Sequence, residues 1–236
     1  MKSIVPIGIL LRSLLKTYSS IFIQSPMKKT LLILLFTLSI NSVFADSPLT
    51  SSVFYQAYLD MPIVQEAYKS KGKITDETWV FILDDMNPLH AKLAIINAIG
   101  YEHEGVMLSN MYLMHFMKAK NYQSYLDFKW GATSDELICY AYMLALDNYY
   151  DTTNAFEIAR EALRKAPNSF AVNIICNLIK SQGLTAYGEY CYASKLFLEI
   201  KSNPNIVMDM RIEALSYIFE YMISISENCK TNYFYK

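Results

Sequence analysis

Apolar residues recur at helical spacing along nearly the whole chain beyond residue 50, and the alternation typical of strands is almost absent. The clearest segment begins at Asn87-Pro88, continues through Leu89 and Leu93, and ends at Gly100. Residues three and four apart fall on one face of an α-helix, whereas Pro and Gly mark helix ends. The sequence therefore predicts an all-α fold of stacked antiparallel helical hairpins, arranged as an α-solenoid or as a compact helical bundle.

Short turn signals place the boundaries of the expected helices. Thr133-Ser-Asp-Glu136 has capping-box spacing, with Glu three residues after Thr, and predicts a helix start. Pro62 is expected to divide the first segment, and Gln182-Gly183 is expected to end a later helix. The expected helical segments cover residues 51–71, 79–86, 89–99, 103–120, 121–130, 137–146, 155–165, 170–181, 185–201 and 207–226.

One stretch, residues 136–168, resembles a tetratricopeptide (TPR) repeat. A helix and a turn are followed by a second helix with small residues at Ala155, Ala159 and Ala162, closed by Pro167. Small residues there let the second helix pack closely against the first, and Pro ends that helix. The usual aromatic and Gly-like positions of the first helix are not clearly matched, and residues 170–204 match only weakly. The resemblance implies hairpins stacked in series and a partner that is a protein or peptide.

A secretory signal peptide is predicted inside the chain, at residues 27–45. The basic start Met27-Lys28-Lys29 precedes an apolar run of about ten residues, and small residues at the end favour cleavage after Ala45. A transmembrane helix needs about 20 apolar residues, so this run is too short to span a bilayer. A buried first helix or a membrane anchor is the alternative. The protein is expected to be exported, periplasmic or secreted, with no integral membrane span after cleavage.

Residues 1–26 precede this signal and fit poorly into a folded domain. They carry Lys2, Arg12 and Lys16 but no acidic residue. An upstream start codon chosen in error, with Met27 as the true initiator, explains them most simply, and a long basic region of the signal peptide is the alternative. Residues 46–236 are then expected to form a single all-α helical-repeat domain.

The charge of the expected mature chain argues against two classes of partner. Removing residues 1–45 takes away five basic and no acidic residues, so the formal net charge falls from −1 to −6. A mildly acidic chain binds nucleic acid and anionic membrane surfaces poorly, because both are themselves negatively charged. No nucleic-acid partner is expected.

All four cysteines, Cys139, Cys176, Cys191 and Cys229, lie in the expected mature chain. An even number in an exported protein permits two disulfides. The first three lie among apolar residues at helical positions, where a free Cys acts as a small hydrophobic residue. Buried free thiols are therefore expected. No CxxC pair or Cys/His cluster indicates a metal site.

The sequence contains no motif of a catalytic or cofactor site. GxSxG, GxxxxGK[ST] and GxGxxG are missing, and His103-Glu104 lacks the second His of a zinc HExxH site. We expect no catalytic residue, no metal and no cofactor. The alternative is an all-α envelope hydrolase that uses a carboxylate cluster from Asp84, Asp85, Glu102 and Glu104, with or without His103.

Tyrosine is abundant, with 19 residues in the chain, many of them in its C-terminal half. Tyr is enriched at protein interfaces, and helical solenoids present a concave groove through their first helices. Tyr140, Tyr142 and Tyr187 are therefore predicted to line a binding groove, the alternative being packing between helices. The leading hypothesis is an exported, non-catalytic scaffold of a bacterial envelope that binds a protein or peptide. A purely structural subunit of an oligomer is a further alternative.

Overall fold

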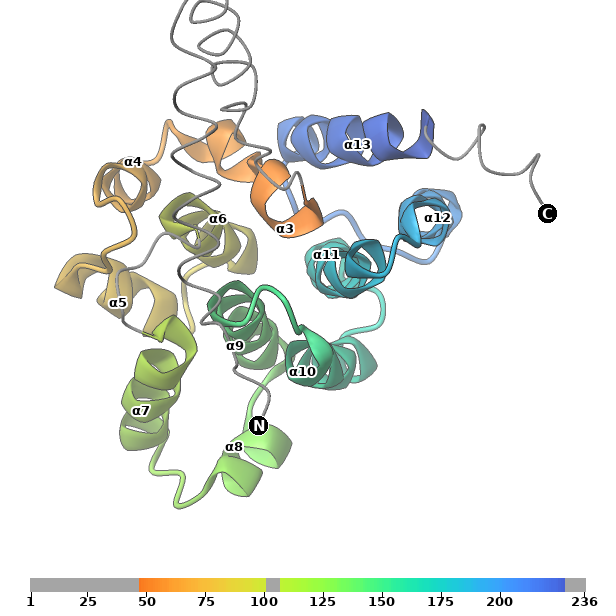
Figure 1. Cartoon of the computed structure of the whole chain (residues 1–236). Helices are drawn as coiled ribbons and strands as arrows, with labels where there is room; N and C mark the ends of the chain where they lie inside the picture. Colours follow the sequence, from red (N-terminus) through yellow and green to blue (C-terminus); the bar gives the residue numbers. More distant parts are fainter. Residues whose placement is uncertain (1–46, 101–106, 228–236) are drawn as a thin grey trace, which may run out of the picture. The chain divides into compact units, whose positions relative to one another are not determined.

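The computed structural model describes residues 47–100 and 107–227, all within the compact unit Asp46–Lys236. These residues form α-helices, one 3-10 helix and a single isolated bridge, which confirms the predicted all-α class (Figure 1). The expected extension at 1–26, the signal peptide at 27–45 and its cleavage site lie outside the described residues. Within the described ranges, no helix combines the length and the apolar character needed to cross a membrane.

Caps predicted from the sequence set several of the helix ends. Thr133 Oγ1 accepts the N–H of Glu136 at 3.3 Å, and Glu136 Oε2 accepts the N–H of Thr133 at 2.6 Å, which completes the capping box. Gly100 ends the helix before it with a φ of 68°, a left-handed conformation that favours Gly. The elements are α3 (Pro48–Ser51), η1 (Phe54–Tyr58), α4 (Pro62–Lys69), α5 (Asp76–Leu83), α6 (Leu89–Ile99), α7 (Leu108–Lys120), α8 (Tyr125–Gly131), α9 (Ser134–Asp147), α10 (Thr153–Lys165), α11 (Phe170–Ala186), α12 (Tyr190–Ser202) and α13 (Ile212–Glu227).

The predicted end of α11 before Gln182-Gly183 is wrong, because the helix continues to Ala186. Gln182 is buried, and its amide accepts the N–H of Leu49 and donates to the carbonyl of Tyr149. These contacts anchor the extra turn, and no local signal in the sequence encodes them. As a consequence, α12 starts later than predicted, at Tyr190.

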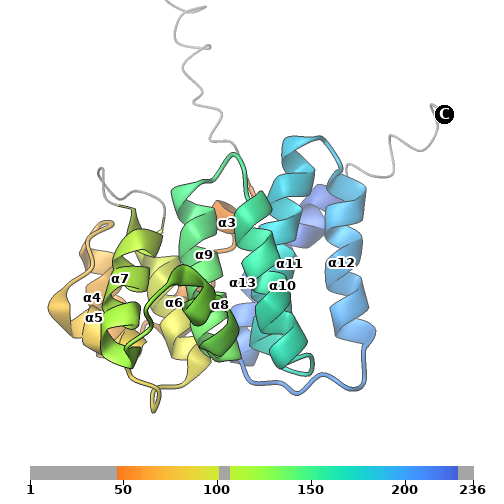
Figure 2. The same ribbon diagram turned by 90° about the horizontal axis from the view of Figure 1, so that it is seen from below.

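The helices pack as antiparallel neighbours in a stack. In Figure 1, α6, α9 and α11 form a row, and in Figure 2 helices α9, α10, α11 and α12 run side by side. Helix α9 contacts both α6 and α11, and α10 packs against α9 and α11. The hairpins α9–α10 and α11–α12 thus follow one another in the stack.

The small residues predicted to allow close packing of the α9–α10 hairpin are buried. Ala155, Ala159 and Ala162 are at most 2% exposed. The hydroxyl of Ser134, the first residue of α9, donates to the carbonyl of Ala162 at 2.8 Å. Pro167 lies exposed in the turn between α10 and α11, where it ends α10 as predicted. The relationship to TPR proteins stays a prediction.

Candidate functional site

The structure does not bring the three predicted groove tyrosines together. Tyr140 and Tyr142 are two residues apart on α9 and therefore point about 200° apart around the helix. Tyr140 lies in a buried aromatic cluster, with its ring centroid 5.3 Å from that of Phe128 on α8. Tyr187 follows the end of α11 and is 88% exposed. The prediction of a single groove lined by all three is therefore wrong. Of the three, Tyr142 is the one that lies on the face of the row formed by α6, α9 and α11.

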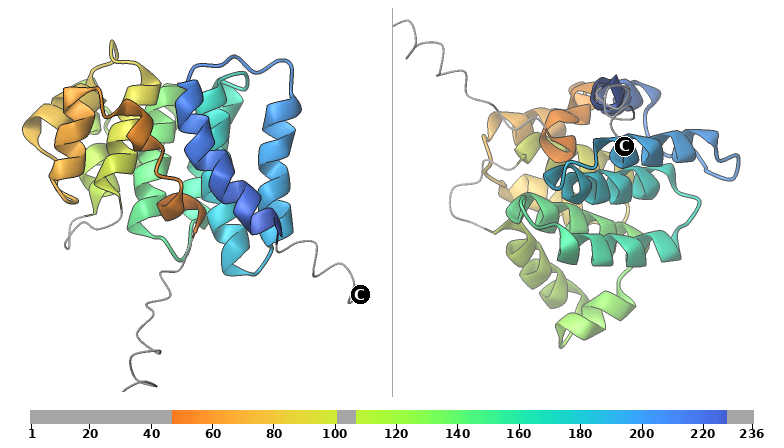
Figure 3. Two further views of the ribbon diagram at one scale, coloured as in Figure 1. Left: turned by 90° about the horizontal axis from the view of Figure 1, so that it is seen from above. Right: turned by 45° about the vertical axis from the view of Figure 1, so that its right-hand side comes forward.

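The face that Tyr142 lines is covered by the chain itself. Residues 47–58, which we call the inner segment, run across α6 and α11 beside α13, as the left view of Figure 3 shows. Leu49, Phe54 and Tyr58 of this segment are at most 1% exposed. The ring of Phe54 stacks on that of Tyr142 at a centroid distance of 6.3 Å. The inner segment therefore contributes to the hydrophobic core.

Side chains of the helices hold the main chain of the inner segment. Asn97 of α6 accepts the N–H of Tyr55 at 2.9 Å and donates to the carbonyl of Ser52 at 3.1 Å. The same Asn97 amide donates to the hydroxyl of Tyr142 at 2.8 Å. On α11, Gln182 Oε1 accepts the N–H of Leu49 at 3.4 Å. The groove predicted for a partner is thus filled from within the molecule.

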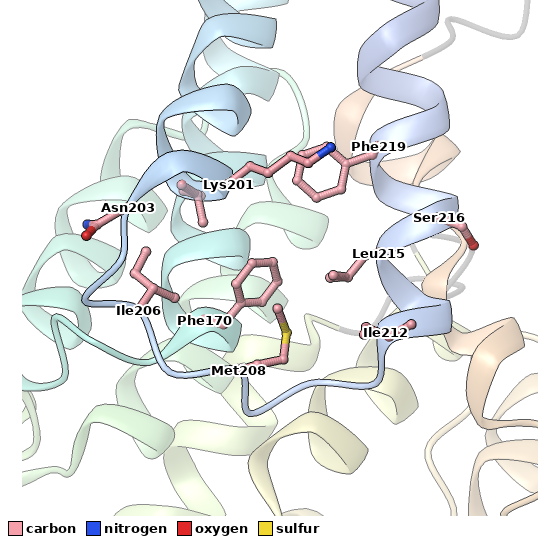
Figure 4. A pocket seen from close by; sticks show the side chains of 10 residues that line it. Phe170, Lys201, Asn203, Ile206, Met208, Ile212, Leu215, Ser216 and Phe219 are labelled. Carbon is pink, nitrogen blue, oxygen red and sulfur yellow. The ribbon is translucent and has the colours of Figure 1, made fainter.

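An open apolar cavity of about 440 Å³ lies between α12 and α13, at the end of the stack that these two helices form (Figure 4). Its volume falls within the range of about 300–1,000 Å³ typical of ligand sites. A second cavity, of about 450 Å³, lies beside the inner segment and reaches Gly100, where the first described range ends. The first cavity, which we call the α12–α13 cleft, is our candidate site. It is lined by Phe170, Ile200, Lys201, Asn203, Ile206, Met208, Ile212, Leu215, Ser216 and Phe219.

The linker between α12 and α13 forms the floor of the cleft and is fixed to α11. The N–H of Val207 donates to the carbonyl of Asn168 at 2.7 Å, and the N–H of Phe170 donates to the carbonyl of Val207 at 3.1 Å. The carboxylate of Asp209 accepts the N–H of Ala171, in the first turn of α11, at 2.7 Å. A negative charge at a helix N-terminus is favourable, so this contact stabilises both partners. These bonds also explain why α13 starts at Ile212 and not near residue 207 as predicted.

Arg211 fixes the start of α13 to the inner segment. Its backbone N–H donates to the hydroxyl of Tyr58 at 3.0 Å, and its guanidinium donates to the carbonyl of Ala57 at 2.8 Å. The guanidinium also pairs with Asp60 and lies 4.7 Å from the centre of the Tyr58 ring. The floor of the cleft and the start of its α13 wall are therefore held by contacts within the chain.

The surface of the cleft is apolar apart from three side chains. Seven of its ten described lining residues are apolar, and two of them, Met208 and Ile212, are 49% and 70% exposed. Lys201 reaches from α12 toward α13, with its ammonium 5.9 Å from the centre of the Phe219 ring (Figure 4). Such a surface can bury apolar groups of a ligand, and the described residues that line it include no acid–base pair.

The carboxylates named for the hydrolase alternative do not converge in the described part of the chain. Asp84 accepts the N–H of Met86 at 2.9 Å in an exposed turn. Asp85 pairs with Lys120, and this hydrogen bond lowers the pKa of its carboxyl, whereas a general acid needs a raised pKa. The other three residues, 102–104, lie outside the described residues. Among the described residues, no group of three or more His, Cys, Asp or Glu is placed to hold a metal ion.

The cysteines follow the prediction of free thiols only in part. Cys139 and Cys176 are free and buried, and burial raises the pKa of each thiol to about 12, so neither is a reactive nucleophile. Cys191 is disulfide-bonded, so its prediction as a free thiol is wrong. It lies half-buried in the first turn of α12, outside the apolar interior that periodicity suggested. Cys229 lies outside the described residues.

The sequence reasoning missed the α12–α13 cleft. Leu215 and Phe219 are four residues apart on α13 and show the spacing of an ordinary core-facing stripe. The break at Asn203-Pro204 marked the linker, but nothing local indicates that the linker holds α13 away from α11. Comparisons with protein families, curated proteins and solved structures find no significant match. The function is therefore argued from the cleft itself.

Proposed function

We propose that this protein is an exported, non-catalytic scaffold that binds a peptide segment of a partner protein in the α12–α13 cleft. One observation carries the proposal: the cleft is open, apolar and already formed by fixed elements. The groove along α6, α9 and α11 supports the proposal indirectly. Because the inner segment fills that groove, the cleft is left as an open concave surface at the α12–α13 end of the stack. The signal-peptide pattern and the expected envelope location belong to the same proposal.

The size and stiffness of the cleft suit a short peptide. A segment that buries about 200 Å² of apolar surface gains about 5 kcal/mol at about 25 cal/mol per Å². Part of this gain offsets the loss of translational and side-chain freedom on binding. Because Asp209 and Arg211 already fix the linker and α13, little of that loss falls on the protein. Moderate affinity for apolar segments is therefore expected.

Selection from a displayed library of random 12-residue peptides tests this function. Peptides rich in large apolar residues are expected to emerge, with their binding measured by fluorescence polarisation. Leu215→Asp places a charge in the cleft and is expected to weaken binding at least about tenfold, because a buried unpaired charge is costly. Leu126→Asp is the matched control, since Leu126 lies on α8 and is 61% exposed. Circular dichroism checks that both variants fold.

Two results would overturn the proposal. The first is the absence of selected peptides, and the second is equal binding by the wild type and Leu215→Asp. Sedimentation of the purified protein measures its oligomeric state and so tests the alternative that it is a structural subunit of an oligomer. If the protein is a dimer that Leu215→Asp dissociates, the cleft holds a second copy of the chain and the protein is a structural subunit.

A further inference from the structure

We infer that the α12–α13 cleft selects peptide segments in which a carboxylate, from Asp or Glu, accompanies the apolar residues, and that Lys201 determines this selectivity. The inference rests on the proposed function and names the chemistry of the partner. It starts from Lys201 near the end of α12, the one charged side chain among the described residues that line the cleft.

Lys201 has no counter-charge in the part of the chain that the structure describes. Within residues 47–100 and 107–227, its ammonium forms no ion pair with a carboxylate. Its neighbour in the cleft is the Phe219 ring, 5.9 Å away, which attracts a cation through the ring face. Figure 4 shows the side chain stretched across the cleft between the two helices. The positive charge is therefore exposed to any ligand that enters.

Covering the cleft changes the environment of this charge. In the free protein, water solvates the ammonium, because Lys201 is an exposed residue. An apolar ligand removes that water, and an ammonium buried without a partner is strongly unfavourable. A ligand that carries a carboxylate replaces the lost water with a charge-assisted hydrogen bond, which is stronger than a neutral one. The requirement for an acidic group thus follows from the apolar character of the rest of the cleft.

A competing possibility is that Lys201 swings out of the cleft when a ligand binds. The lysine side chain has a flexible four-carbon stem and can place its ammonium in water while the stem packs on apolar surface. In that case, the ligand would need no acidic group. The two possibilities predict different peptide sequences and different responses to charge reversal, so one experiment separates them.

The test uses the peptides selected on the wild-type protein and a second selection on Lys201→Glu. Asp or Glu is expected to be enriched among wild-type binders, and replacing that residue by Gln or Asn in one peptide is expected to weaken binding about tenfold. Lys201→Glu is expected to select Lys or Arg at the same position and to bind the correspondingly substituted wild-type peptide. Lys195→Glu is the matched control, because Lys195 is also exposed on α12 but does not line the cleft.

The outcomes separate this inference from the proposed function. If apolar peptides bind and Leu215→Asp abolishes binding, but no acidic residue is enriched, Lys201 is not a selectivity residue and the scaffold function stands. Equal effects of Lys195→Glu and Lys201→Glu would also refute the inference, because they would indicate a general charge effect. If no peptide binds the wild type, both proposals fail.

Discussion

Replacement of Asn97 by Ala tests whether the inner segment is held mainly through its main chain. Asn97 is 8% exposed and bonds three groups: the N–H of Tyr55, the carbonyl of Ser52 and the hydroxyl of Tyr142. In Asn97→Ala, all three groups lose their partner. The perturbation is therefore much larger than the loss of one surface hydrogen bond.

The expected magnitude follows from those three groups. A buried polar group left without a partner costs about 1–3 kcal/mol, so three groups at the low end cost about 3 kcal/mol. Ala favours a helix interior over Asn by about 0.5 kcal/mol, which offsets a small part of this loss. With an m-value of about 2.5 kcal/mol per M, the urea midpoint of Asn97→Ala is expected to fall by about 1 M.

Urea unfolding followed by circular dichroism measures this change. Asn110→Ala is the matched control, because Asn110 is exposed on α7 and, among the described residues, its amide bonds only the sulfur of Met107; its midpoint is expected to move little. A double-mutant cycle of Asn97→Ala with Tyr142→Phe is expected to give a coupling of about 1 kcal/mol for their shared bond. A loss below about 1 kcal/mol in Asn97→Ala would refute the reasoning, since water would then replace the amide.

Three further predictions concern other parts of the molecule. Burial lowers the pKa of His90 below 6.5, so the unfolded chain binds the proton first and stability falls as the pH drops through about 6.5. His90→Phe is expected to flatten this pH dependence of the urea midpoint; an unchanged slope in His90→Phe would contradict the assignment. Asp209→Ala is expected to destabilise the protein by about 1–2 kcal/mol and to weaken peptide binding, because the linker is no longer held at α11; intact binding would show that the floor of the cleft needs no such anchor. Non-reducing peptide mapping is expected to recover the Cys191 peptide in a disulfide-linked form and the Cys139 and Cys176 peptides as free thiols; recovery of Cys191 as a free thiol would refute this.

Local signals predicted the helices whose ends depend on neighbouring residues. Thr133 caps α9 and Gly100 ends α6, and each acts within one turn of its own position. The inner segment could not be predicted in the same way. The sequence predicts a helical segment from residue 51 that is divided at Pro62, but the structure contains the short α3 and η1, whose polar main-chain groups are bonded by Asn97 and Gln182.

The candidate site depends on distant parts of the chain to a greater extent. Tyr142 was predicted in a groove, and it does line the face of the first helices, but the occupant of that face lies almost 90 residues earlier in the chain at Phe54. The cleft depends on Asp209, which holds the linker against α11, and on Arg211, which holds the start of α13 against the inner segment, through contacts that span 38 and 154 residues. Periodicity reports which face of a helix is buried, but it does not report what lies against that face.

The position of the inner segment also constrains the order in which the protein can fold. Leu49 bonds a residue 133 positions later, and Tyr58 bonds one 153 positions later. Contacts of such large sequence separation form slowly, because the chain must close a long loop before they contribute stability. During synthesis, the inner segment emerges before α11 and therefore has no docking site until α11 and the start of α13 have also emerged. Nascent chains shorter than about 210 residues would leave Leu49, Phe54 and Tyr58 exposed, which makes them candidates for chaperone binding before folding is complete.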